Sequence, residues 1–487
     1  MSTSSGTGVM PDATAPIASG RQPRKILAVL LLAGVSFALS QTMVIPALPA
    51  LSRSLGANAS SSSWLLTGYL LSASVATPIV GKLGDLYGKG RTLTIVLLLF
   101  SVGAVVCALG TSIGVVIAGR VIQGVAGGVF PLAFGIIRET FPREKVASGL
   151  GLLSAIFGIG GGIGLPLAGV VVDHLDISWI FWSGLIALPA ALAAHRLVPA
   201  SPTAERARID WLGAGLLSAG LVAILLGVSK ANDWGWGSAT TVGLFVSGLA
   251  ILAVWVRVEA TRAEPLIDLR VLRQRAVAAT NLTGLLVGFA MFASFLLIPQ
   301  FAQAPEGTGY GFGLSVTQSG LLIAPAAFVQ LLVGPVVGSL GTRFGFRSML
   351  ALGGASVALS FAVLSVQHSH PWDFVISGAL LGAGISLALA SMANLIVDVV
   401  RQSEVGIATG INTVMRTVGG AFGAAVATAI LTATTIPGSP LPTEGAYEAA
   451  FLVSAGGGLL ALGAALLIPT RRAAAAAADA LPAPAHG

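Results

Sequence analysis

The chain has 487 residues, of which only 9% are Lys, Arg, Asp or Glu, and its mean hydropathy is +0.90. A soluble domain carries roughly 25% charged residues. This composition therefore excludes a set of soluble domains and indicates a protein embedded in a lipid bilayer.

Apolar stretches that could cross a bilayer follow one another along almost the whole chain. A helix needs about 20 apolar residues to cross the hydrocarbon core. The sequence therefore predicts an all-α membrane protein with fourteen transmembrane helices, the first of which is too long to be a cleavable signal. They lie near residues 26–49, 64–81, 92–111, 113–136, 148–171, 178–199, 210–229, 239–257, 276–303, 318–341, 347–366, 373–397, 404–432 and 447–469.

The basic residues predict how these helices are oriented. With an even number of helices, both termini share one side, and placing them in the cytoplasm puts 22 of the 26 Lys and Arg residues there. Such an excess is what the positive-inside rule describes. The net charge of +7 therefore reflects orientation beside anionic headgroups, and we expect no nucleic-acid partner. The polar segment 1–24 and the Ala/Pro-rich segment 471–487 predict disordered cytoplasmic tails.

One loop sequence occurs twice, at residues 81–91 after the second predicted helix and at 338–347 after the tenth. Both copies place glycines at the same offsets and finish with basic residues. A repeated loop indicates two six-helix bundles related by duplication. We therefore predict an N-terminal bundle over 25–200, an inserted pair of helices over 201–270 and a C-terminal bundle over 271–470.

The loop at 81–91 resembles the signature loop of the major facilitator superfamily, and further motifs resemble its fourteen-helix drug:proton antiporter branch. The resemblance implies a secondary transporter that exports amphipathic drugs or antibiotics by alternating access in exchange for protons. It also implies a hydrophobic substrate, no cofactor, a monomer and a location in a bacterial cell membrane. The motifs are Ala47-Leu48-Pro49, Trp64 to Tyr69, Arg120 to Gly128 and Gly160 to Gly169.

Two other functions stay open at this stage. An importer of a small metabolite would share the fold, although the glycine-rich fifth helix and the inserted pair favour export. A membrane enzyme would need a nucleophile with its base, or a metal cluster, inside the spans. The sequence contains no HExxH motif, and His174, His368 and His370 are interpreted as plain surface residues. We therefore expect a transporter with no catalytic residue and no metal site.

The first loop predicts a conformational lock. In the family, the carboxylate at the position of Asp85 holds the two bundles together through a basic residue and a helix N-terminus. The basic residue that usually follows the acid is Leu86 here, and the second loop has Thr342 in place of the acid, so any lock is asymmetric. The candidate lock residues are Gly81, Asp85, Gly88, Lys89, Arg91 and Arg343.

Polar side chains within the predicted helices are candidates for the proton or substrate pathway. An Arg in the bilayer costs about 2.5–3.5 kcal/mol on insertion scales, so Arg120 and Arg416 should face a wet cavity or a partner. A structural anchor to backbone carbonyls is an equally good interpretation of Arg120, and a structural contact between the bundles is an equally good interpretation of Arg416. The candidates are Arg120, Gln123, Gln41, Thr42, Asn281, Asn394, Asn412 and Arg416, with Gln330 as a further polar group at depth.

The fifth predicted helix carries small residues at intervals of four, which allow close helix packing. In the family, the neighbour of this helix belongs to the other bundle. Pro166 predicts a kink, although it stands one place later than the usual Gly-Pro pair. The candidate residues of this antiporter motif are Gly160, Gly164, Pro166 and Gly169.

No carboxylate falls at the midpoint of a predicted helix. Where the first helix of the family often carries an Asp, this chain has Ser40. We therefore expect a neutral or anionic substrate, held near Arg416 or Arg120, because nothing in the bilayer would neutralise a multivalent cation. Proton coupling rests on the family resemblance alone.

Overall fold

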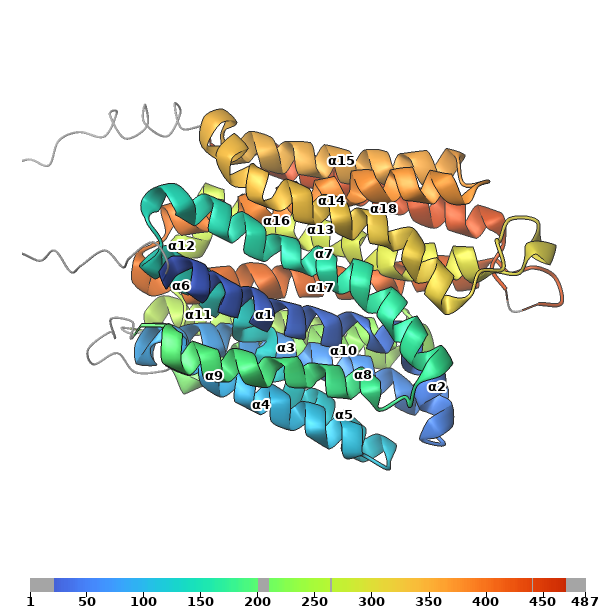
Figure 1. The fold of residues 1–487 in the computed structure, drawn as a ribbon, viewed down its shortest axis with the longest axis horizontal. Helices are drawn as coiled ribbons and strands as arrows, with labels where there is room; N and C mark the ends of the chain where they lie inside the picture. Colours follow the sequence, from blue (N-terminus) through green and yellow to red (C-terminus); the bar gives the residue numbers. More distant parts are fainter. Residues whose placement is uncertain (1–21, 200–209, 263–264, 440, 470–487) are drawn as a thin grey trace, which may run out of the picture.

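The computed structural model describes residues 22–199, 210–262, 265–439 and 441–469 (Figure 1). The described residues form long helices arranged side by side in two groups, with a further pair of helices against them. The tails expected at 1–24 and 471–487 lie outside the described residues, except that 22–24 are the first residues of a helix.

The N-terminal bundle contains six spans, three of which are built from two helices each. Their breaks occur where a proline follows about four residues later, since proline cannot donate to the carbonyl of residue i−4. The prolines concerned are Pro46, Pro131 and Pro189. The helices are α1 (Gln22–Thr42), α2 (Val44–Ser54), α3 (Ala59–Tyr87), α4 (Lys89–Leu109), α5 (Ile113–Gly124), α6 (Val129–Thr140), α7 (Arg143–His174), α8 (Trp179–Trp182) and α9 (Ala187–Leu197).

The remaining helices form the inserted pair and the C-terminal bundle. The pair is α10 (Trp211–Trp234) and α11 (Ala239–Thr261), and a short helix α12 (Leu269–Arg273) leads into the bundle. The bundle contains α13 (Arg275–Gln303), α14 (Val316–Phe344), α15 (Phe346–Val366), α16 (Pro371–Val399), α17 (Val405–Ala433) and α18 (Glu444–Leu466).

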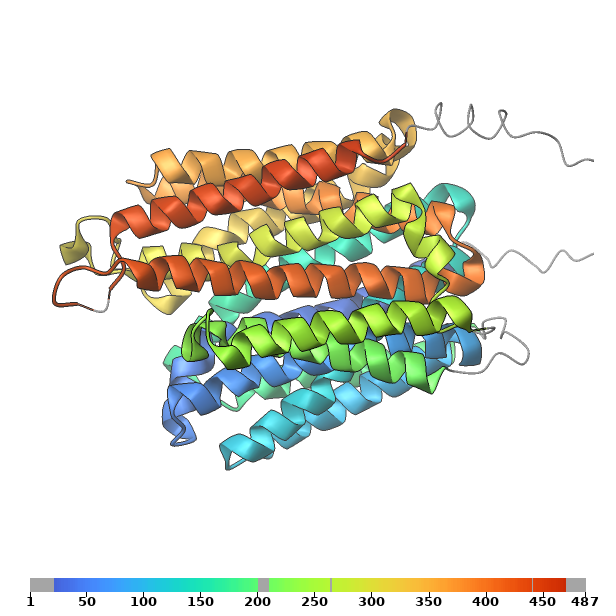
Figure 2. The ribbon, with the colours of Figure 1, turned by 180° about the vertical axis from the view of Figure 1, so that it is seen from behind.

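Thirteen helical segments of the described chain have the length and hydropathy of a membrane span. The one predicted span that is not among these thirteen is the fifth, near 148–171. It corresponds to α7, a continuous helix of 32 residues whose second half, Gly162–His174, is apolar. The structure therefore agrees with the predicted fold of two six-helix bundles and an inserted pair. We call the end at which α1 begins and α18 ends the terminal end, and the opposite end the distal end (Figure 2).

Two pairs of helices join the bundles. Helix α7 lies along α14, and α3 lies along α17, so each bundle contributes one helix to each seam (Figure 1). Helix α10 lies over the second seam, because Thr67 Oγ1 on α3 is 2.6 Å from Ser229 Oγ and Asn232 Nδ2 donates to the carbonyl oxygen of Ala425 on α17 at 3.0 Å.

The repeated loop forms the same turn in both bundles. Gly88 and Gly345 have φ values of 95° and 88°, which residues with a side chain rarely adopt. Each donates its N–H to a glycine four residues earlier, Gly84 at 3.0 Å and Gly341 at 2.9 Å. The backbone of the turn therefore requires the glycine that ends each copy, Gly88 or Gly345.

Candidate functional site

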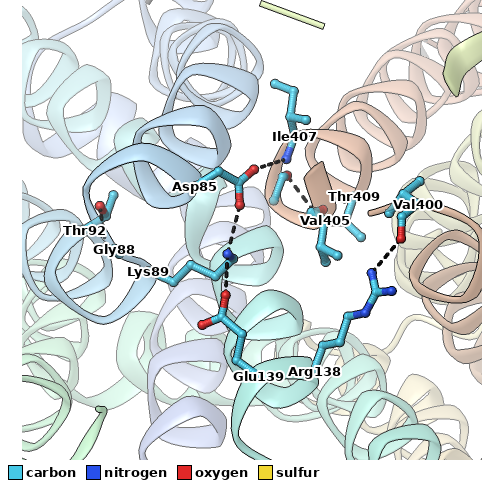
Figure 3. Close-up of polar contacts among 11 residues, drawn as sticks. Asp85, Gly88, Lys89, Thr92, Arg138, Glu139, Val400, Val405, Ile407 and Thr409 are labelled. Carbon is cyan, nitrogen blue, oxygen red and sulfur yellow. Dashed lines mark hydrogen bonds and ion pairs between the residues drawn. The ribbon is translucent and has the colours of Figure 1, made fainter. Parts of the chain in front are cut away.

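A buried group of charges lies at the terminal end, where α3, α4 and α6 meet α17 (Figure 3). Lys89 Nζ lies 3.0 Å from Asp85 Oδ1 and 2.6 Å from Glu139 Oε1, and the three side chains are at most 9% exposed. One cation between two carboxylates leaves the group with a net negative charge. Such a group is stable in a buried place only where further donors reach it.

The further donor comes from the other bundle. The backbone N–H of Ile407 donates to Asp85 Oδ2 over 3.3 Å, near the first turn of α17, where the helix dipole favours a negative charge. The contact is close because Gly81 lies against Gly406, and a Cβ on Gly81 would be 2.6 Å from the carbonyl oxygen of Gly406. Asp85 thus connects its own bundle to the other one, as the lock hypothesis requires.

A second hydrogen bond crosses the same end. Arg138 Nη1 on α6 donates to the carbonyl oxygen of Val400 at the end of α16, over 2.9 Å (Figure 3). Neither Arg138 nor Glu139 was among the predicted lock residues. The only feature of the sequence that could have indicated their role is their position directly before the turn that follows α6. Their partners lie on other helices, which the sequence does not identify.

Two predicted lock residues are placed differently. Arg91 is exposed on α4, and Arg343 is exposed near the end of α14, with its guanidinium 5.1 Å from the Phe344 ring. In the second loop, the Thr342 hydroxyl donates to the carbonyl oxygen of Ser339 on its own helix. The second loop packs closely through Gly338, whose Cβ would be 2.6 Å from the backbone nitrogen of Ser148 on α7, but it brings no charge to the seam.

Arg120 is fully buried inside the N-terminal bundle. Its Nη1 donates to the Ser40 carbonyl oxygen at 3.2 Å and to Gln123 Oε1 at 2.9 Å, and its Nε donates to the Leu65 carbonyl oxygen at 3.1 Å. The guanidinium also lies 4.0 Å from the centre of the Tyr69 ring. Arg120 therefore joins α5 to α1 and α3, Gln123 accepts from Arg120 on the same helix, and neither residue lines the cavities described below.

A crevice between the bundles widens toward the distal end. Its widest part, about 340 Å³, lies between α2 on one side and α13 and α14 on the other. Two narrower parts of about 10 and 20 Å³ continue it toward the middle of the molecule. The polar residues along the three parts are Gln41, Thr42, Thr77, Gln300, Gln303, Ser319, Thr413, Arg416 and Thr417, and no Asp or Glu lines them among the described residues.

Three of the pathway candidates line this crevice. Gln41 on α1 and Arg416 on α17 face its innermost part from opposite bundles, beside Phe37 and Phe292. Thr42 lines the next part, and its hydroxyl also lies 2.6 Å from the carbonyl oxygen of Gly160 on α7.

Apart from Arg120 and Gln123, the other candidates lie on helices of the C-terminal bundle. Asn412 Nδ2 on α17 donates to Asn281 Oδ1 on α13 at 3.2 Å, and Asn394 Nδ2 donates to the carbonyl oxygen of Ala390 within α16. Gln330 is buried on α14 at 5% exposure. Asn281 also borders an apolar pocket of about 370 Å³ between the inserted pair and α13 and α17. None of these residues lines the crevice.

Helix α7 has two close-packing faces. Gly160 and Gly164 lie against α1 in the same bundle, where their Cβ atoms would meet Ala38 and Thr42. Gly169 lies against Thr317 on α14, and Pro166 lies against Gly320 of the same helix. The expectation that α7 packs on the other bundle therefore holds for Pro166 and Gly169, whereas Gly160 and Gly164 contact their own bundle.

The chain is similar to a known family and to known proteins over most of its length. The family model described as Major Facilitator Superfamily matches residues 30–311 and 280–485. An uncharacterized MFS-type transporter of Mycobacterium tuberculosis is 30% identical over 79% of this chain and 56% of its own length. The tetracenomycin C resistance and export protein of Streptomyces glaucescens is 28% identical over 77% of this chain and 69% of its own length.

Further similarity comes from a second bacterial protein and from a solved structure. The multidrug transporter protein MdtP of Bacillus subtilis is 26% identical over 80% of this chain and 72% of its own length. The crystal structure of the human organic anion transporter MFSD10 covers 91% of this chain and 99% of its own, with a TM-score of 0.64 at 15% identity. The predicted fold and family are confirmed, and the family and relatives that match are described as transporters and not as enzymes. The chain spans just over half the length of the Mycobacterium tuberculosis relative. With its two bundles and repeated loop, it belongs to the Major Facilitator Superfamily.

Proposed function

We propose that the chain exports amphipathic small molecules across a bacterial cell membrane by alternating access. The observation that carries this proposal is the contrast between the two ends of the molecule. The terminal end is closed by Asp85 and Arg138, whereas the crevice is widest at the distal end. Two relatives named for export or multidrug transport are consistent with this direction, although their identities are only 28% and 26%.

The proposal includes an orientation. If the terminal end lies in the cytoplasm, as the distribution of basic residues favours, the described conformation faces outward and the crevice is where a substrate leaves. Both termini are then cytoplasmic, in the inner or plasma membrane of a bacterium. We expect the chain to work as a monomer, because each transport pathway lies between two bundles of one chain.

The substrate class follows from what lines the crevice. Phe37, Phe292 and Phe295 offer apolar surface, and Arg416 places a guanidinium beside Gln41. A buried guanidinium attracts anions and hydrogen-bond acceptors and repels cations. We therefore expect neutral or anionic amphiphiles to be exported in preference to dications.

Proton exchange is the proposed driving force. The family resemblance suggests it, and two groups could take part. Protonation of Asp85 would remove the charge that attracts the first turn of α17 and Lys89. The cluster around Arg120 also contains buried polar atoms without a hydrogen-bond partner among the described residues, on Tyr69, Arg120 and Gln123, and such atoms commonly bind water. Water there would bind beside Arg120, which donates directly to Ser40, the neighbour of Gln41 in the crevice.

The first experiment measures uptake into inside-out membrane vesicles. Energised vesicles with the wild-type chain should accumulate an anionic amphiphilic dye, and a protonophore should abolish the accumulation. Arg416→Gln should raise the KM for the anionic dye about tenfold, because a charge-assisted interaction of about 1.4 kcal/mol is lost. The KM for a neutral amphiphile should change by less than threefold.

The control is Arg343→Gln, which removes an exposed guanidinium outside the crevice and should change neither KM. Accumulation in right-side-out vesicles only would indicate import and contradict the proposal. Uphill uptake that survives the protonophore would refute proton coupling. If Arg416→Gln raised the KM equally for the anionic dye and the neutral amphiphile, the role of Arg416 would be refuted.

A further inference from the structure

The distal end of the C-terminal bundle contains a histidine between two carboxylates. His368 follows α15, and Glu444 and Glu448 lie one turn apart at the start of α18. His368 Nε2 is 3.0 Å from Glu444 Oε1 and 3.9 Å from Glu448 Oε1. The sequence suggested a plain surface histidine, but His368 is only 6% exposed.

The hydrogen bonds of His368 determine where its proton lies. Its Nδ1 is 2.8 Å from the carbonyl oxygen of Leu364, which can only accept, so Nδ1 carries the hydrogen. In the neutral ring, Nε2 then presents a lone pair to the two carboxylates. A lone pair and carboxylate oxygens at 3.0 Å repel one another unless a cation lies between them.

We propose that His368, Glu444 and Glu448 bind a divalent transition-metal ion of the Zn²⁺ type. Zn²⁺ binds imidazole nitrogen and carboxylate oxygen at about 2.0–2.2 Å, which places tetrahedral ligand atoms about 3.3 Å apart. The three ligand atoms already lie within 4.8 Å of one another. The bond from Nδ1–H to a backbone carbonyl is the support that metal-bound histidines usually have.

The surroundings hold the imidazole in place for this role. The Phe301 ring meets the His368 ring edge to face at 5.4 Å, and it also packs on Tyr447, which lies between the two glutamates on α18. The glutamate side chains are about half exposed, at 51% and 46%. An ion can therefore reach the site from water, and a water molecule can occupy the fourth position.

The position of the site predicts what the ion does. It joins the end of α15 to the start of α18, and both helices belong to the C-terminal bundle. The ion stabilises that bundle without restraining its movement against the other one. Binding should therefore raise thermal stability and leave the rate of transport unchanged.

The test uses the full chain, purified in detergent with any affinity tag removed, and Zn²⁺ alone as the probe. We expect one equivalent of bound Zn²⁺ by calorimetry at pH 7.5 and a higher Tm in its presence. Glu448→Gln and Glu444→Gln keep the size of an exposed side chain and should each weaken Zn²⁺ binding at least about tenfold. His368→Ala should abolish both the binding and the Tm shift.

The matched control is Glu306→Gln, which changes an exposed carboxylate of the preceding distal loop and should leave Zn²⁺ binding intact. Zn²⁺ binding that none of the three ligand substitutions weakens would overturn the proposal. So would an absence of Zn²⁺ binding, because a proton on Nε2 would then be the cation between His368 and the glutamates.

Discussion

Asp85 and Thr342 occupy the same position in the two copies of the repeated loop, and they show how one side chain distinguishes the two seams. Asp85 reaches across to the backbone of α17, whereas the Thr342 hydroxyl bonds its own helix. Both loops keep the glycines that allow close approach. Of the two equivalent loop positions, only the one in the seam between α3 and α17 brings a charged side chain to the other bundle.

Asp85→Asn should weaken the closure of the terminal end. The amide keeps the size of the side chain but loses the charge that attracts Lys89 and the first turn of α17, which is worth about 1–2 kcal/mol in a partly buried geometry. Lys89 still has Glu139 as a partner, so the chain should remain folded. In a drug-sensitive bacterial host, the minimal inhibitory concentration of an exported compound should fall at least about fourfold.

Thr342→Ala is the matched control, because it changes the equivalent residue of the other loop without touching the seam. Host susceptibility should stay at the wild-type value with this variant. Equal losses from Asp85→Asn and Thr342→Ala, at equal amounts of protein in the membrane, would contradict the role assigned to Asp85.

At the scale of the element, α7 shows why small residues recur along one helix. Thr42 on α1 places its hydroxyl 2.6 Å from the Gly160 carbonyl oxygen, and a Cβ on Gly164 would be in contact with the same hydroxyl. The interval of four residues therefore serves a contact within the N-terminal bundle. The other face of α7 serves the seam with α14.

Gly164→Ala should destabilise the chain by about 1–3 kcal/mol, because the added methyl group overpacks the contact with Thr42. Thr42→Ala should cost about 1 kcal/mol, the value of one buried hydrogen bond. In the double variant the methyl group has room. The double variant should therefore lose less unfolding free energy than the two single variants lose together. Thermal unfolding in detergent measures the coupling, and strict additivity would show that Gly164 does not pack on Thr42.

The sequence predicted the elements well and their contacts less well. Long apolar runs and the glycines of the repeated turn depend on neighbouring residues, so the fourteen spans and the turns at Gly88 and Gly345 followed from local patterns. The partner of a buried polar residue depends on helices far away in the chain. For that reason Arg138, Glu139 and the burial of His368 could not be predicted.

The same limit applied to the pathway candidates. Arg120, Gln123 and Arg416 are all polar groups within a span, and hydropathy cannot distinguish a side chain that faces its own bundle from one that faces the crevice. The structure makes this distinction: Arg416 lines the crevice, and Arg120 bonds Ser40 and Leu65 inside the bundle.

At the scale of the whole molecule, the two seams lie on opposite sides of the crevice and are built from equivalent helices. At the terminal end, Gly81 meets Gly406 in one seam and Gly338 meets Ser148 in the other. If the bundles move as rigid bodies, opening one seam at this end must open the other and narrow the distal cavity. Loosening a single local contact would have no such distant effects.

Gly81→Leu should favour a conformation that is open at the terminal end and narrowed at the distal end. The Cβ of the leucine would lie 2.6 Å from the Gly406 carbonyl oxygen, so the α3–α17 seam could not close. Cysteine accessibility measures the result in a Cys107→Ser background, since Cys107 is the only cysteine of the chain. We expect a cysteine at Ser148, in the other seam, to react at least about tenfold faster with a polar maleimide. A cysteine at Gln303, in the distal cavity, should react correspondingly more slowly.

Gly243→Leu is the control for this experiment. A Cβ at Gly243 meets no atom within 4 Å, so this variant should leave both reaction rates unchanged. A faster reaction at Ser148 with no change at Gln303 would show that the end frays locally and would contradict rigid-body movement of the two bundles.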